Sequence, residues 1–159
     1  MEYSNSSIRR QNCLLDQTNA IHLLNHGEYG VLSIQNLEGG AYGVPLNYVW
    51  DGDSSIFIHC APVGRKLAAI KACPEVSFCI VGVVQIIPGE FTTNYESIIL
   101  QCKAVLQLSL EEKMKAMGLM VGKYSPEYKD TGVAYAEKAL SRMEVIRLDI
   151  KHWSGKCKK

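Results

Sequence analysis

Three consecutive segments between residues 29 and 60 alternate apolar and polar side chains, and this alternation narrows the possible folds more than any other feature. They read YGVLSIQN (29–36), AYGVPLNYVWD (41–51) and SSIFIHC (54–60), separated by the turn sequences LEGG and DGD. Alternation with a period of about two places successive side chains on opposite faces of a strand. The region therefore predicts three antiparallel strands joined by hairpins.

The second of these segments contains a proline. Pro45 has no N–H group for a strand ladder, so the strand must lie at an edge, carry a bulge, or face a ligand at that point. Gly43 and Asn47 share its face, which is shallow and rich in hydrogen-bonding groups. Such a face could accept a flat heteroaromatic ring or simply pack under a loop. The opposite face carries Tyr42, Val44, Leu46, Tyr48 and Trp50.

The rest of the chain mixes helical and extended patterns. We expect a helix from near Asp16 to Gly27, a short helix over 64–72, and a helix that begins with the Ser109–Glu112 capping box and ends at Gly122. A less regular helix is expected within 125–142. Further strands are predicted over 75–87, with both faces covered, over 95–108, and over 143–153.

Helices inserted between hairpin-connected strands predict an α+β fold built on an antiparallel β-barrel, whose closure would leave no exposed edges. No linker or repeat divides the 159 residues, so we expect a single domain over 1–159, with 1–12 as a flexible or partner-contacting arm.

Composition excludes several functions. The net charge of +1 gives no electrostatic reason for nucleic acid or an anionic membrane as a partner. No apolar run approaches the roughly 18 to 20 residues of a membrane helix, and the polar N-terminus predicts a cytoplasmic protein. The six cysteines form no C-x-x-C pair, and His22 and His26 lack further ligands, so we predict no metal site.

The stretch FIHCAPVGRKLAAI (57–70) is the chemically most informative. Arg65 and Lys66 follow Gly64 at the start of a helix, where free N–H groups and the helix dipole favour an anion such as phosphate. His59 ends the preceding strand and could donate a proton to a substrate beside that anion. The alternatives are two solvated cations and a histidine that only packs at the rim of the core.

Several segments in order resemble the 5-nitroimidazole reductase (Nim) family of pyridoxamine 5′-phosphate oxidase-like flavoproteins. They are YGVLS, YGVPLNYVWDG, IFIHCAPVGRKLAAI, VSFCIVG, EFTTNYESIIL and HWSGK, and the resemblance runs from about residue 8 to 156. The C-terminus HWSGKCKK lacks the Arg-Leu-x-x-Arg type of segment found in true pyridoxamine 5′-phosphate oxidases. The resemblance therefore does not imply vitamin B6 oxidation.

The resemblance implies an FMN-binding split β-barrel that forms a homodimer with two flavins in clefts between the subunits; FAD is also possible. It assigns the flavin phosphate to Arg65 and Lys66 and a position near the reaction to His59. The other residues that it assigns to the cleft are Pro45, Leu46, Asn47, Tyr48, Thr93, Asn94, Tyr95, Ser97, Trp153 and Lys156.

Together these points predict a flavin-dependent reductase of small electron-poor organic acceptors, such as the nitro group of a 5-nitroimidazole, with His59 as catalytic residue. Because no G-x-G-x-x-G motif follows a strand, the electron donor, a reduced nicotinamide or a redox protein, would bind only transiently. The alternative is a flavin- or haem-binding storage or sensor protein on the same fold, without turnover.

Overall fold

A computed structural model describes all residues from 1 to 159. The helices are α1 (Gln17–His26), α2 (Arg65–Ala72), α3 (Leu110–Tyr124) and α4 (Lys129–Ala139). The strands are β1 (Glu2–Tyr3), β2 (Gly30–Gln35), β3 (Ala41–Leu46), β4 (Val49–Trp50), β5 (Ser55–Cys60), β6 (Glu75–Ile87), β7 (Thr92–Val105) and β8 (Glu144–Lys158). None of the helices is long and apolar enough to cross a bilayer.

Two of the helices begin where the sequence predicts. The Asp16 carboxylate accepts the Asn19 N–H at 2.9 Å, which caps α1. Ser109 and Glu112 form the expected reciprocal capping box at the start of α3. The α3 helix continues past Gly122 to Tyr124, two residues beyond the predicted end.

The strands form one antiparallel sheet in the order β3-β2-β6-β7-β8-β5-β4, with β1 added in parallel to β8. The α+β split-barrel fold is therefore confirmed. The expectation of complete closure is wrong, because β3 and β4 are unpaired with each other at the two ends of the hydrogen-bonded order. Pro45 accordingly lies on an edge strand, which is one of the places where a sheet tolerates a proline.

The predicted strand over 41–51 is two strands in the structure. Its first part pairs with β2 and its second part with β5, which are different neighbours in the sheet. The chain crosses from one edge to the other through only two residues, Asn47 and Tyr48. We call this crossing the seam (residues 47–48).

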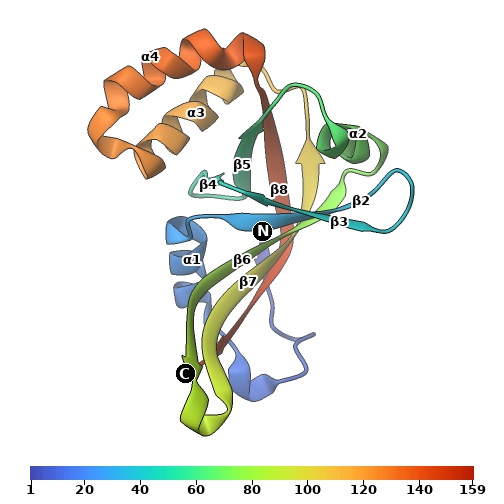
Figure 1. The fold of residues 1–159 in the computed structure, drawn as a ribbon, viewed down its shortest axis with the longest axis vertical. Coiled ribbons are helices and arrows are strands. Elements are labelled where there is room, and N and C mark those ends of the chain that lie inside the picture. Colours follow the sequence, from blue (N-terminus) through green and yellow to red (C-terminus); the bar gives the residue numbers. More distant parts are fainter.

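The core lies inside the curled sheet, against α1. Its fully buried side chains include Leu24, Leu32, Tyr48, Phe78, Ile98, Leu100 and Ile146. A second, smaller apolar cluster packs α3 and α4 against the outside of β4, β5 and β8, through residues that include Val49, Phe57, Met117, Ala136 and Val145. Figure 1 shows these two helices on one side of the sheet and α2 on the other.

The long strands β6, β7 and β8 extend beyond this body as a curved ribbon (Figure 1). Only the first half of β6 is covered, since Val83 and Ile86 are 73% and 71% exposed. The prediction that residues 75–87 are covered on both faces is therefore wrong for the second half. Strand β7 begins at Thr92, so Thr93 and Asn94 are strand residues rather than loop residues, and β8 continues past residue 153 to Lys158.

Candidate functional site

The start of α2 offers hydrogen-bond donors and positive charge together. Gly64 precedes the helix with a φ of 145°, a conformation that favours glycine. No side chain caps the first turn, and no acidic residue lies in it. The N–H groups of this turn are therefore free to donate hydrogen bonds to an anion, next to the positive charges of Arg65 and Lys66.

Arg65 is positioned by the edge strand. Its guanidinium carbon lies 3.8 Å from the centroid of the Tyr42 ring of β3, which is a cation–π contact. The contact brings the start of α2 and the edge strand of the sheet together. The alternation of the strand places Tyr42 on its apolar face but indicates no function for it, because its partner Arg65 comes from a helix more than 20 residues later in the chain.

His59 lies near the end of β5, opposite Val145 of β8, and remains exposed to solvent. Although His59 is exposed, protein atoms around the imidazole displace part of its water, and this partial burial lowers its pKa. The positive charge of Lys66 lowers the pKa further. At neutral pH the ring is therefore neutral and carries a single N–H. Cys60 lies beside the same lysine; burial raises its pKa, and Lys66 opposes that rise. His59, Cys60 and Lys66 thus form one group next to the phosphate-type donors.

The seam is held by contacts from distant helices. Tyr48 is fully buried, and its hydroxyl donates to the Leu24 carbonyl of α1 at 2.7 Å. The Tyr48 N–H donates to the Tyr124 hydroxyl at 3.0 Å, and Lys123 Nζ donates to the Tyr48 carbonyl at 3.1 Å. Asn47 donates to the Glu28 carbonyl at 3.0 Å. Of the predicted residues in this strand, Pro45 and Asn47 are exposed, Leu46 is half-buried, and Tyr48 is a core residue.

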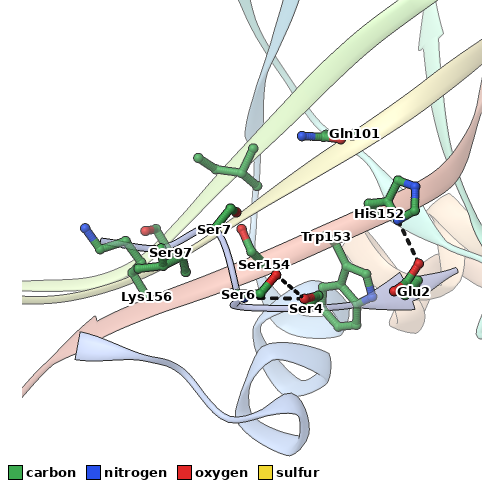
Figure 2. Close-up of a pocket in the computed structure, with 12 residues that line it drawn as sticks. Glu2, Ser4, Ser6, Ser7, Ser97, Gln101, His152, Trp153, Ser154 and Lys156 are labelled. Carbon is green, nitrogen blue, oxygen red and sulfur yellow. Dashed lines mark hydrogen bonds and ion pairs between the residues drawn. The ribbon is translucent and has the colours of Figure 1, made fainter. Parts of the chain in front are cut away.

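The remaining predicted residues lie on the ribbon. Ser97 of β7 is directly opposite Lys156 of β8, and both line a groove of about 540 Å³ under the N-terminal arm. Figure 2 shows this groove with serines of the arm facing serines of the two strands. Trp153 lies beneath Tyr3, with ring centroids 4.6 Å apart, and its buried indole N–H has no partner. Thr93, Asn94 and Tyr95 lie farther along β7, toward the tip.

One chain thus brings together only part of the predicted set. His59, Arg65 and Lys66 meet at the junction of β5, α2 and β3. The ribbon residues lie on β7 and on the part of β8 beyond its pairing with β5.

A sequence profile of pyridoxamine 5′-phosphate oxidase matches residues 16–157, which is most of the chain. The chain belongs to the pyridoxamine 5′-phosphate oxidase family. No curated protein shows a significant sequence match.

Solved structures with the family fold are similar to the chain over most of its length. One is a protein from Bacteroides thetaiotaomicron provisionally assigned to 5-nitroimidazole antibiotic resistance, with a TM-score of 0.74, 19% identity, and coverage of 91% of this chain and 86% of that one. A conserved hypothetical protein of Mycobacterium tuberculosis has a TM-score of 0.78 at 14% identity, covering 93% and 88%. The FAD- and heme-binding protein of Mycobacterium smegmatis has a TM-score of 0.73 at 15% identity, covering 91% and 72%. At these sequence identities, the similarity shows a shared fold and nothing about function.

Two residues that hold the seam in place carried no recognisable sequence signal. Lys123 and Tyr124 reach the seam from α3, about 75 residues away in the chain. Only the folded structure shows that the end of this helix holds the crossing between the two edge strands.

Proposed function

We propose that the protein is a flavin-dependent reductase that reduces small electron-poor organic acceptors, such as the nitro group of a 5-nitroimidazole, in a cleft between the subunits of a homodimer. The observation that carries the proposal is the junction of α2 with β5. There Arg65, Lys66 and the uncapped first-turn N–H groups lie next to His59. Membership of the pyridoxamine 5′-phosphate oxidase family supports a flavin as the group that this junction binds.

The residues present fit the phosphate end of FMN. A phosphate there would meet two cations and unpaired backbone donors, without any acidic side chain in the first turn of α2. The exposed Pro45 on the adjoining edge strand β3 offers the flat surface that a ring system needs. The ribbon residues Ser97 and Lys156 would complete the cleft from the partner subunit.

Bound flavin would supply the hydride, whereas the protein supplies position and electrostatics. His59 carries one ring N–H at neutral pH, because both burial and Lys66 disfavour its protonated form. In that state it can donate a hydrogen bond to an oxygen of the acceptor and orient it. A reduced nicotinamide or a small redox protein, bound only during reduction, is the electron donor that we propose.

The first experiment measures FMN affinity by fluorescence titration of the apoprotein. Removing either cation, by Arg65→Gln or Lys66→Gln, should weaken binding at least about tenfold, since each loses a charge-assisted bond. Lys71→Gln is the matched control, because Lys71 lies in the last turn of the same helix. Equal affinities in all four proteins would contradict the placement of the phosphate.

The second experiment tests catalysis. The His59→Ala protein should retain flavin, and reoxidation of its reduced flavin by a 5-nitroimidazole under anaerobic conditions should slow about tenfold or more. An unchanged rate would exclude a role for His59 in the reaction.

A second candidate function is flavin or haem binding without turnover. The likeness to the FAD- and heme-binding protein of M. smegmatis favours this alternative. Failure of the reduced protein to react with a broad panel of acceptors, combined with tight flavin or haem binding, would support it over the reductase.

A further inference from the structure

A groove apart from the junction of α2 and β5 lies between the end of α1, the seam and α3. It has a volume of about 740 Å³, within the range of small-molecule sites. Its walls include Asn47 and Trp50 from the region of the seam and Lys123 from α3. None of His59, Arg65 and Lys66 lines it, so this groove is separate from the junction that holds His59.

Lys123 contributes a positive charge to the groove without a matching carboxylate. It takes part in none of the ion pairs of the chain. One of its three N–H groups donates to the Tyr48 carbonyl, and Nζ lies 3.8 Å from the centroid of the Tyr48 ring. These contacts fix the position of the ammonium group and leave other donors free.

The groups around this lysine favour an anion. Besides Lys123, the titratable residues lining the groove are Lys129, His26, Tyr124 and the exposed Glu28. Lysines thus outnumber carboxylates two to one. Burial lowers the pKa of Lys123 to about 8, which is the effect of a cation that lacks its counter-charge.

The same groove has room for an apolar body. Gly118 and Gly122 line it one helical turn apart, and a Cβ added to either would find no atom within 4 Å. Leu119 also lines it, and the Trp50 indole is held beside it by a bond of 3.2 Å from Nε1 to the Asp53 carbonyl. A flat ring can therefore lie over bare helix backbone next to an indole.

We propose that this groove binds a small organic acid, with its carboxylate on Lys123 Nζ and its flat apolar body between Trp50 and the Gly118–Gly122 face of α3. The site is independent of the flavin function. An acid bound there would also contact the seam, since Lys123 holds the Tyr48 carbonyl.

The probe is 4-fluorobenzoate, observed by broadening of its ¹⁹F signal in the presence of the flavin-loaded protein and of the apoprotein. Binding in the millimolar range or tighter is expected in both, and neutral 4-fluorobenzamide should bind at least about tenfold more weakly because it lacks the charge. Equal binding of the two probes, absence of binding, or loss of binding on flavin loading would each overturn the proposal.

Two variants locate the site. Lys123→Met removes the cation and Gly122→Leu fills the groove, and each should weaken 4-fluorobenzoate binding at least about tenfold. Lys138→Met on α4 is the matched control and should bind as the native protein does. Undiminished binding in both test variants would place the acid elsewhere.

A third measurement uses the native sequence and so does not depend on the folding of a variant. NMR of ¹³C-methylated lysines should show the pKa of Lys123 rising when 4-fluorobenzoate is added, because the carboxylate stabilises the ammonium form. An unchanged Lys123 pKa at saturating probe would contradict the proposed contact.

Discussion

At the scale of single residues, burial and the charge of Lys66 both disfavour the protonated form of His59. Its pKa lies below the ordinary value of 6.5 because of burial and this neighbouring cation. The folded protein therefore binds the proton less readily than the unfolded chain does, so His59 lowers stability as the pH falls through 6.5. We expect Lys66→Met to raise the His59 pKa in an NMR titration, whereas Lys71→Met should leave it nearly unchanged. An unchanged His59 pKa in the Lys66→Met protein would show that the lysine does not act on it.

The same scale explains which site residues could be found from the sequence. His59, Arg65 and Lys66 lie within eight positions of one another, so a strand end followed by a glycine and a helix start was enough to bring them together. Tyr42 and Lys123 act through contacts with residues far away in the chain, with Arg65 and with Tyr48. Such contacts depend on how the sheet curls, which no local pattern encodes.

At the scale of elements, two helical glycines in different surroundings allow a matched test. Gly122 of α3 has open space where a Cβ would lie, so Gly122→Ala should stabilise the protein by about 0.5–1 kcal/mol through helix propensity. Gly132 of α4 is different, because its Cβ would lie 2.7 Å from Val121 Cγ1. Gly132→Ala should therefore gain nothing or destabilise the fold. Urea unfolding compares the two, and equal stabilisation would mean that the α3–α4 packing is looser than the structure shows.

The ends of helices and strands could be predicted where nearby residues set them, and could not where distant strands do. The starts of α1 and α3 were predictable, since Asp16 and Ser109 satisfy backbone N–H groups three residues ahead. The break at residues 47–48 was not, because apolar alternation continues across it while the strand partners change from β2 to β5. The sequence predicted too much burial for β6, because an apolar run has the same pattern whether its own chain or another molecule covers it.

At the scale of the whole molecule, the ribbon exposes more apolar surface than a lone chain would be expected to leave in water. Val83, Ile86 and Phe91 are 73%, 71% and 97% exposed. We propose that a second copy of the chain covers them, so Val83→Asp should shift the protein from dimer to monomer in light scattering and weaken flavin binding. Leu37→Asp, at the exposed β2–β3 turn, is the control and should remain dimeric. A native protein that is monomeric with bound flavin would contradict the shared cleft.

The seam also has a consequence for the time course of folding. The hydrogen bonds that hold it join Tyr48 to Lys123 and Tyr124, which lie 75 and 76 residues farther along the chain. Loops of that length close late, after hairpins such as β4–β5 have formed from neighbouring residues. We therefore expect the two sheet edges to be joined in the last stage of folding, so that changes at Tyr124 mainly speed unfolding and leave the folding rate nearly unaltered.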